Sequence, residues 1–260
     1  MVDHHHTHDD HICWGGGHRH PGGHTLYLQD VSAGYGKQKA VEGVNLTITC
    51  GHSLALIGPN GAGKSTLLNA LAGLRPLLSG SILWNGQPLH TMRREIAFLP
   101  QRSEVDHQFP ITVRELVEMG RYPSLGVWGS MRPHDREIVQ KALDSLEIAH
   151  LAARQVGELS GGQQQRAFLA RAMAQEAHIL LLDEPFSGLD VPGTESLGAL
   201  LRSLAEEGRL VIASHHDLAS APRLFSHTLL LRRRPVAFGP TAQVLSPQNL
   251  QTAFPPTAQA

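Results

Sequence analysis

A glycine-rich loop between a strand pattern and a helix pattern constrains this chain more than any other feature. Residues 58–66 read Gly-Pro-Asn-Gly-Ala-Gly-Lys-Ser-Thr and match the phosphate-loop pattern G-x-x-x-x-G-K-[ST]. Residues 53–57 read as a short buried strand, and after the loop leucines recur at helical spacing, at Leu67, Leu68, Leu71 and Leu74. This order turns backbone N–H groups and a helix N-terminus toward one phosphate chain. The sequence therefore predicts a nucleotide phosphate site.

Each residue type of this loop has an expected role. Glycine is needed where a Cβ would block close approach of the backbone or where φ is positive. We expect Lys64 to reach the β- and γ-phosphates and the Ser65 hydroxyl to hold Mg²⁺. The predicted nucleotide-binding residues of the loop are Gly58, Asn60, Gly61, Ala62, Gly63, Lys64, Ser65 and Thr66.

Composition excludes several classes of protein. The 22 Lys and Arg residues nearly balance the 23 Asp and Glu residues. The chain therefore lacks the surplus of basic residues that would indicate nucleic acid as a partner. The two cysteines, Cys13 and Cys50, cannot build a disulfide framework, and a reducing compartment fits them. No apolar run approaches the length of a membrane span, and the histidine-rich start lacks the apolar core of a secretory signal. We therefore expect a cytoplasmic protein whose membrane contact, if any, is peripheral.

Residues 1–24 differ from the rest of the chain. They contain eight of the 17 histidines, interleaved with aspartates, Cys13 and glycines. Such a segment cannot bury a core and is predicted to be a disordered tail. Imidazole, carboxylate and thiolate groups suit a cation such as Zn²⁺. A tail that binds transition metals and a solvated tail without that role both remain open.

From residue 25 the pattern becomes globular. Residues 26–28, 44–48, 80–86 and 95–100 are predicted strands, the third ending in an Asn-Gly turn and the fourth leading to Gln101. Residues 32–36 are predicted to be a turn that presents Tyr35. An adenine ring stacked on Tyr35 would gain about 1–3 kcal/mol by analogy with nucleic-acid bases. The alternative is a Tyr that fills the edge of the core.

Residues 102–158 change to a helical pattern. Thr112 with Glu115 has the spacing of a capping box, and a second helix is predicted from Pro133. Residues 159–166 read Leu-Ser-Gly-Gly-Gln-Gln-Gln-Arg and begin another helix, with Ser160 as its N-cap. The N–H groups at its start are predicted to bind an anion, which makes candidates of Ser160, Gly161, Gly162 and Gln163.

Two later strands end in side chains that suit phosphate chemistry. The apolar run 179–182 is typical of a central parallel strand and ends in Asp183 and Glu184, at the edge where such sheets bind ligands. Asp183 is expected to hold the Mg²⁺ hydration shell, and Glu184 to polarise the attacking water. Strand 210–214 ends at His215 and His216. His216 is the preferred contact to the γ-phosphate, with His215 as the fallback.

Together these motifs resemble, in order, the nucleotide-binding subunit of ATP-binding-cassette (ABC) transporters, across about residues 25–240. The resemblance implies an ATPase with an α/β phosphate-loop NTPase cassette fold: a mixed β core, an antiparallel β edge and an inserted α-helical lobe. It implies ATP and Mg²⁺ as cofactors and a homodimer, or a dimer of similar subunits, that sandwiches two ATP molecules. The phosphate loop of one subunit would face Ser160–Gln163 of the other, and Gln101 would sense Mg²⁺ and the attacking water. The lobe would touch a separate membrane-spanning permease.

A narrower resemblance involves residues 99–106, 109–113, 119–122 and 215–218, which are similar to the manganese and zinc importer branch. It implies a metal-ion import subunit at the cytoplasmic face of the membrane, with a metal-capturing solute-binding protein acting through the permease. Two features depart from the pattern: the histidine-rich tail, and Cys50-Gly51-His52 where Pro-Gly-Glu is common. No effect on ATP chemistry is expected from that turn.

The predicted division of the chain is a tail (1–24), a cassette (25–240) with the helical lobe (102–158) inserted, and a C-terminal tail (241–260). Three alternatives stay open: a soluble cassette ATPase acting on DNA or ribosomes, an importer subunit for another cargo such as an iron chelate, and a metal-storing protein whose function lies in the tail. The identity of the metal and the direction of transport are not readable from these residues.

Overall fold

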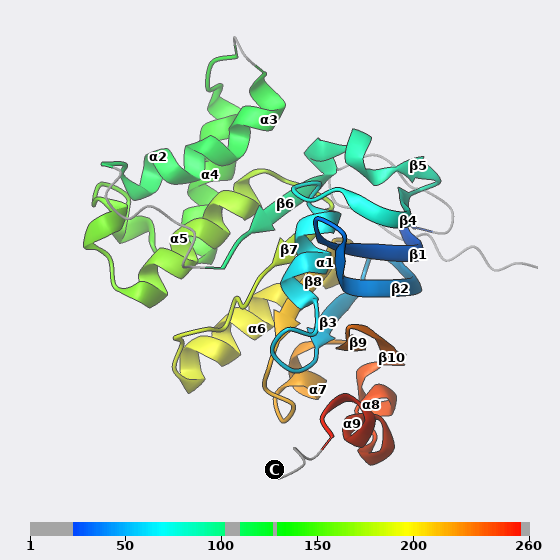
Figure 1. Ribbon diagram of the computed structural model, residues 1–260. Coiled ribbons are helices and arrows are strands. Elements are labelled where there is room, and N and C mark those ends of the chain that lie inside the picture. Colours follow the sequence, from blue (N-terminus) through cyan, green and yellow to red (C-terminus); the bar gives the residue numbers. More distant parts are fainter. Residues whose placement is uncertain (1–22, 102–109, 127–128, 256–260) are drawn as a thin grey trace, which may run out of the picture.

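The computed structural model describes residues 23–101, 110–126 and 129–255. Two sheets and a group of helices make up the molecule (Figure 1). The smaller sheet is antiparallel in the order β2-β1-β4-β5, and the larger has the order β10-β9-β3-β8-β7-β6. All neighbouring strands of the larger sheet run parallel except β10, which is antiparallel to β9. This is the mixed α/β cassette fold that the sequence predicted.

The bounds of the elements are as follows. The strands are β1 (Thr25–Tyr35), β2 (Gln38–Thr49), β3 (Ser53–Ile57), β4 (Leu77–Trp84), β5 (Gln87–Pro88), β6 (Ile96–Leu99), β7 (Ile179–Leu182), β8 (Leu210–His215), β9 (His227–Arg232) and β10 (Arg234–Pro240). The α-helices are α1 (Lys64–Leu71), α2 (Val113–Glu118), α3 (Tyr122–Leu125), α4 (Pro133–Ser145), α5 (Gly161–Ala174), α6 (Val191–Glu206), α7 (Ala221–Leu224), α8 (Thr241–Val244) and α9 (Pro247–Ala253). Short 3₁₀ helices cover Leu89–Thr91, Arg93–Glu95, Met119–Arg121, Ala149–Leu151 and Val156–Glu158.

Helix α1 lies between the two sheets. Its Leu67, Leu68 and Leu71 are buried in one cluster with residues of the antiparallel sheet and with Leu54 and Leu56 of β3. Because successive residues of a strand point to opposite faces, Ala55 and Ile57 belong to the core on the other face. Both faces of the central strands are therefore covered, which explains why β7 is apolar throughout and β8 is apolar from Leu210 to Ala213.

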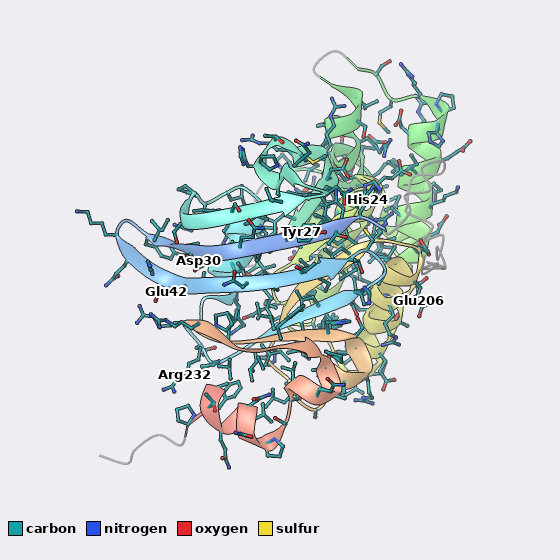
Figure 2. The ribbon with its side chains drawn as sticks, turned by 90° about the vertical axis from the view of Figure 1, so that its right-hand side faces the viewer. His24, Tyr27, Asp30, Glu42, Glu206 and Arg232 are labelled. Carbon is teal, nitrogen blue, oxygen red and sulfur yellow. The ribbon has the colours of Figure 1, made fainter. Side chains whose placement is uncertain are left out.

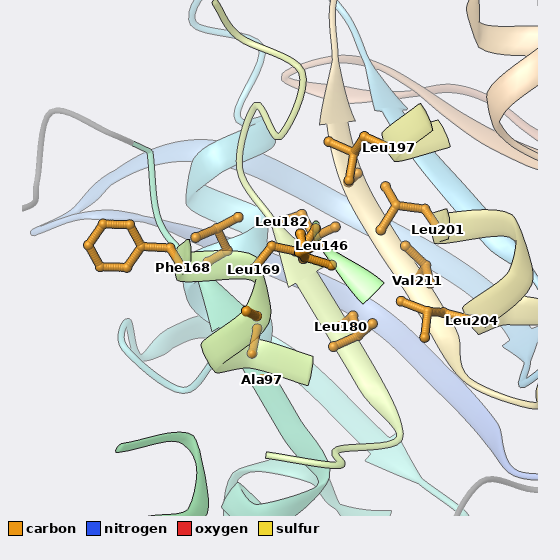
Figure 3. Close-up of a cluster of buried hydrophobic side chains, with 14 of the residues drawn as sticks. Ala97, Leu146, Phe168, Leu169, Leu180, Leu182, Leu197, Leu201, Leu204 and Val211 are labelled. Atoms are coloured by element: carbon orange, nitrogen blue, oxygen red, sulfur yellow. The ribbon is translucent and has the colours of Figure 1, made fainter. Parts of the chain in front are cut away.

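The second core joins the helices to the far face of the parallel sheet (Figure 3). Leu169 of α5 and Leu201 of α6 are buried there with Leu180 and Leu182 of β7. Helices α2 and α4 pack against α5. Helix α5 also contacts β6, so it connects these helices to the sheet.

Local signals predicted the helix starts correctly. Thr112 and Ser160 each form a capping box, with Glu115 and Gln163 respectively. The Asn85-Gly86 turn joins β4 to β5 with positive φ at both residues, as a tight hairpin requires. None of the helices in the described ranges has the length and apolar character to span a membrane.

Three sequence expectations need correction. Residues 32–35 continue β1 and are not a turn, because they pair with β2 and β4 through local register shifts. His24 was assigned to the tail but is buried, with its ring 5.5 Å from Trp84 and 4.8 Å from His178. Residues 241–253 form α8 and α9, which pack on β9 and β10, and bury Val244 and Ala253.

The two sheets are also joined at the turn between β9 and β10. Figure 2 faces the antiparallel sheet, with Tyr27 and Asp30 on β1 and Glu42 on the neighbouring β2. The Arg234 guanidinium donates to the Glu42 carboxylate at 2.9 Å, and the N–H of Glu42 donates to the carbonyl of Arg233 at 2.8 Å. The N–H of Arg233 in turn donates to the carbonyl of Ala62 at 3.1 Å. This turn therefore connects the antiparallel sheet to the phosphate loop.

Candidate nucleotide site

The phosphate loop connects β3 to α1, as predicted. Gly63 is the N-cap of α1 with φ of 97°, and no side chain caps the first turn. The Lys64 ammonium donates to the carbonyl oxygens of Gly58 at 2.8 Å and of Pro59 at 3.1 Å. These contacts curl the loop around the lysine. The uncapped helix start and the lysine together offer positive charge and backbone donors to an anion.

Two carboxylates follow β7 at the carboxyl edge of the sheet. Asp183 is buried, and its Oδ1 accepts a hydrogen bond from the Ser214 hydroxyl at 2.6 Å. Glu184 is half-buried and has φ of 51°, and its carboxylate accepts from the Gln101 amide at 3.0 Å. The end of β6 supplies Gln101 because β6 and β7 are parallel neighbours. Gln101 and Glu184 are thus in direct contact, with Asp183 next to Glu184 in the chain.

Lys64 lies within electrostatic reach of both carboxylates. Burial lowers the pKa of the Lys64 ammonium, while Glu184 and Asp183 oppose that shift. The phosphate loop and the end of β7 therefore form one site, in which the Lys64 ammonium is positive and the Asp183 and Glu184 carboxylates are negative. Such a site can hold a polyphosphate on the lysine and a divalent cation on the carboxylate side.

The residues present fit ATP with Mg²⁺. The anion would meet Lys64 and the uncapped first turn of α1. Oxygen ligands preferred by Mg²⁺ are available from the exposed Ser65 hydroxyl, the Asp183 carboxylate and the Gln101 amide. The required chemical groups are present without any further residue.

Tyr35 ends β1 at the hairpin to β2 and is 59% exposed. Its ring does not fill the core edge, which was the alternative interpretation. The Arg75 guanidinium lies 3.8 Å from the centre of this ring.

The predicted anion-binding start of α5 lies in a different groove. A groove of about 710 Å³ is lined by Ser160, Gly161, Gly162 and Gln163 together with Gly188, Leu189 and Asp190. None of its lining residues belongs to the phosphate loop. Within one copy of the chain, the start of α5 and the phosphate loop therefore do not line the same groove.

The two adjacent histidines have different environments. His215 is buried in β8, where its Nε2 lies 2.8 Å from the Ser220 hydroxyl and its ring contacts Phe186 and Phe225. His216 follows the strand and is exposed. The γ-phosphate contact of His216 stays a prediction, and the exposed His216 side chain is accessible to a ligand.

Acid is expected to destabilise the fold through His215. Burial, with a smaller contribution from His216, lowers the pKa of His215, although Asp217 opposes the shift. Below about pH 6.5 the unfolded chain therefore gains a proton before the folded chain does, so the free energy of unfolding decreases as pH falls. Urea unfolding at about pH 7.5 and about pH 5.5 tests this. His215→Gln should reduce this pH-dependent loss of unfolding free energy, whereas the control His90→Gln, at another exposed histidine, should not. Equal losses in wild type and His215→Gln would contradict the prediction.

Ser214 is a site residue that the sequence analysis missed. Its hydroxyl donates to Asp183 and accepts from the N–H of Glu184 at 2.7 Å, so it fixes both carboxylate residues. The signal was available: β7 and β8 are parallel with Leu182 opposite Ala213, which places Ser214 beside Asp183. Recognising it required the strand pairing and not a motif.

Ser214→Ala is expected to reduce the free energy of unfolding by about 1–3 kcal/mol, because the buried Asp183 carboxylate loses a donor. Urea unfolding at neutral pH measures the change. The exposed Ser203, whose hydroxyl donates to Glu207, provides a matched control. If Ser214→Ala and Ser203→Ala reduce the free energy of unfolding by the same amount, the contact to Asp183 does not stabilise the site.

Two sequence expectations lie outside the described residues. They are the resemblance over residues 102–106, with residue 109, and the metal-binding tail up to residue 22.

Comparison with known proteins identifies the family. Residues 41–187 match the model of the ABC transporter family. The chain is similar to the manganese transport system ATP-binding protein MntB of Bacillus subtilis (strain 168), with 41% identity over 227 residues, 87% of this chain and 91% of that protein. It is also similar to the zinc transport system ATP-binding protein TroB of Treponema pallidum (strain Nichols), with 40% identity over 233 residues, 89% of this chain and 87% of that protein.

Solved structures agree with these matches. The chain superposes on an ABC transporter in an inward-facing conformation with a TM-score of 0.78 and 32% identity, covering 89% of each chain. An ATP-binding subunit of an ABC transporter gives a TM-score of 0.73 with 27% identity, over 84% of this chain and 91% of that one. With the phosphate loop and the carboxylates arranged as described, the chain belongs to the ABC transporter family and is its ATP-binding, ATP-hydrolysing subunit.

Proposed function

We propose that this chain energises the import of manganese or zinc ions through a separate membrane-spanning permease, by ATP-driven closure of a homodimer. The observation that carries the metal assignment is the similarity, at about 40% identity over nearly nine-tenths of the chain, to ATP-binding proteins named for manganese and for zinc transport. An ABC transporter subunit implies a permease. A metal-capturing solute-binding protein would deliver the ion to that permease, and this chain would sit at the cytoplasmic face of the membrane.

The residues of the site have distinct roles in this proposal. Lys64, with the backbone of residues 58–66, binds the β- and γ-phosphates. Ser65, Asp183 and Gln101 hold Mg²⁺, which when bound neutralises charge on the phosphate oxygens. Glu184 accepts a proton from the attacking water, and His216 orients the γ-phosphate. Tyr35 stacks on the adenine ring.

Dimer closure follows from the separation between the start of α5 and the phosphate loop. Ser160 and the start of α5 lie in a groove away from the phosphate loop of the same chain. A second copy that presents this groove to the phosphate loop completes the site, with N–H groups of Gly161, Gly162 and Gln163 on the γ-phosphate. ATP then joins the two copies, and its hydrolysis releases them.

The lobe carries this motion to the permease. Gln101 donates to Glu184 in the site and precedes the helical lobe in the chain, and in this proposal it links the bound nucleotide to the lobe. Met119 and Tyr122 of the lobe are 38% and 57% exposed. These side chains are available for a membrane partner.

The proposal is tested by total cellular metal in the source organism under metal-limited growth. Wild type is compared with a chromosomal Glu184→Gln variant and with Glu137→Gln, an exposed residue of α4, as the matched control. A selective drop in manganese or zinc in Glu184→Gln alone names the cargo and supports import. A selective rise means export and overturns the direction. No change in any metal overturns the metal assignment and leaves an ABC subunit for another cargo, such as an iron chelate.

A further inference from the structure

Arg75 lies directly on the aromatic ring assigned to adenine stacking, although no sequence motif singled it out. The carbon Cζ of its guanidinium is 3.8 Å from the centre of the Tyr35 ring. Its Nη1 also donates to the carbonyl of Gly34 at 3.1 Å, next to Tyr35 in the chain. These two contacts fix the guanidinium over one face of the ring. Tyr35 nevertheless remains 59% exposed, so much of the residue is accessible to a ligand.

We propose that Arg75 is a positioning residue for the nucleotide base: it holds Tyr35 from one face so that the adenine ring stacks on the other. The proposal rests on the proposed function only in taking Tyr35 as the adenine contact. Arginine suits this role because its planar guanidinium stacks on an aromatic ring while an N–H of the same group reaches a backbone carbonyl. A lysine ammonium has no plane with which to do both.

The advantage of such a support is conformational. A tyrosine at the tip of a hairpin would lose side-chain freedom when a base stacks on it, and that loss reduces affinity. Arg75 fixes the ring before the nucleotide arrives. The Tyr35 side chain is then already ordered in the unliganded protein, so ATP binding does not have to order it.

The hairpin that carries Tyr35 also contacts the phosphate loop, which sets the distance between the base and phosphate contacts. A Cβ on Gly34 would lie 1.9 Å from the carbonyl oxygen of Gln38, so β1 and β2 approach closely beside Tyr35. A Cβ on Gly63 would lie 2.6 Å from the carbonyl oxygen of Ala40, so the phosphate loop also packs closely on β2. Arg75 comes shortly after α1, which starts at that loop. Tyr35 is therefore tied to the phosphate loop along two routes.

The test separates base binding from phosphate binding. Dissociation constants for Mg²⁺-ATP and for Mg²⁺-tripolyphosphate, which has no base, are measured by calorimetry on the full chain and on Arg75→Ala. A lost cation–π contact predicts about two- to fivefold weaker ATP binding in Arg75→Ala, with tripolyphosphate unchanged. Arg136→Ala, an exposed arginine of α4, is the matched control and should change neither constant.

Tyr35 supplies the second comparison. In a Tyr35→Ala background, Arg75→Ala should have no further effect on ATP, because the partner through which Arg75 acts is gone. Arg75→Lys should recover only part of the affinity, and it replaces Arg75→Ala if that variant does not fold. Equal losses for ATP and tripolyphosphate, an undiminished effect in the Tyr35→Ala background, or tighter ATP binding in Arg75→Ala would each overturn the proposal. If Tyr35→Ala itself leaves ATP affinity unchanged, the adenine assignment in the proposed function fails instead.

Discussion

Replacing Glu184 with Gln is expected to leave ATP binding intact and to reduce the turnover number by about 10²–10⁴, the usual contribution of a general base. The amide keeps an oxygen that can accept the hydrogen bond now donated by Gln101. Geometry is therefore preserved, and the loss is confined to the ability to take a proton from water. Phosphate release measures turnover, and calorimetry measures ATP affinity.

The same variant should also accumulate as a dimer in the presence of Mg²⁺ and ATP, because the nucleotide that joins two copies is no longer removed. Size-exclusion chromatography with and without ATP detects this species. Glu137→Gln makes the same chemical change at an exposed position and should behave like wild type. Normal turnover in Glu184→Gln would show that Glu184 is not the base.

Replacing Lys64 with Ala should weaken ATP binding about ten- to a hundredfold. A charge-assisted hydrogen bond is worth about 1.5–3 kcal/mol, and 1.4 kcal/mol corresponds to a tenfold change in affinity. Lys64 is partly desolvated, as the lowered pKa of its ammonium indicates, and it faces Glu184 and Asp183. Its removal leaves two carboxylates without a compensating cation where the phosphates bind, which adds repulsion to the lost contact.

Calorimetry with ATP and with tripolyphosphate measures this effect, and both ligands should be affected. Lys64→Ala should weaken the binding of both ligands, whereas Arg75→Ala should weaken the binding of ATP alone. Lys141→Ala on the exposed face of α4 controls for the loss of one positive charge. Unchanged affinity in Lys64→Ala would mean that the loop does not hold the phosphates.

Features fixed by neighbouring residues were predictable from the sequence. The caps at Thr112 and Ser160 need only a side chain three residues away, and the Asn85-Gly86 turn needs only two residues that tolerate positive φ. The four apolar residues of β7 predicted a strand buried on both faces. In each case the physical cause lies within a few residues of chain.

Features fixed by pairing between distant segments were not predictable in this way. Residues 32–35 carry glycine and serine, which indicate a turn, yet hydrogen bonds to β2 and β4 make them part of a strand. Residues 241–253 were expected to be a tail, yet they form α8 and α9 and pack on β9 and β10, with Ser246 capping α9 and Pro247 in its first turn. The intrinsic preference of a residue for helix or strand is worth a few tenths of a kcal/mol to about 1 kcal/mol, so tertiary contacts readily override it.

The sequence by itself determined the chemistry of the site: the phosphate loop with Lys64, the carboxylates after β7, and Gln101 after β6. These groups are tied to motifs because a phosphate and a cation demand particular atoms at particular chain positions. Only the tertiary structure decided which side chains support them. Ser214 reaches Asp183 because β8 pairs with β7, and Arg75 reaches Tyr35 because α1 packs beneath the antiparallel sheet. A side chain can support a site residue from any position in the sequence, provided that the fold brings the two residues close together. Such contacts between distant segments therefore follow from the tertiary structure and not from a local motif.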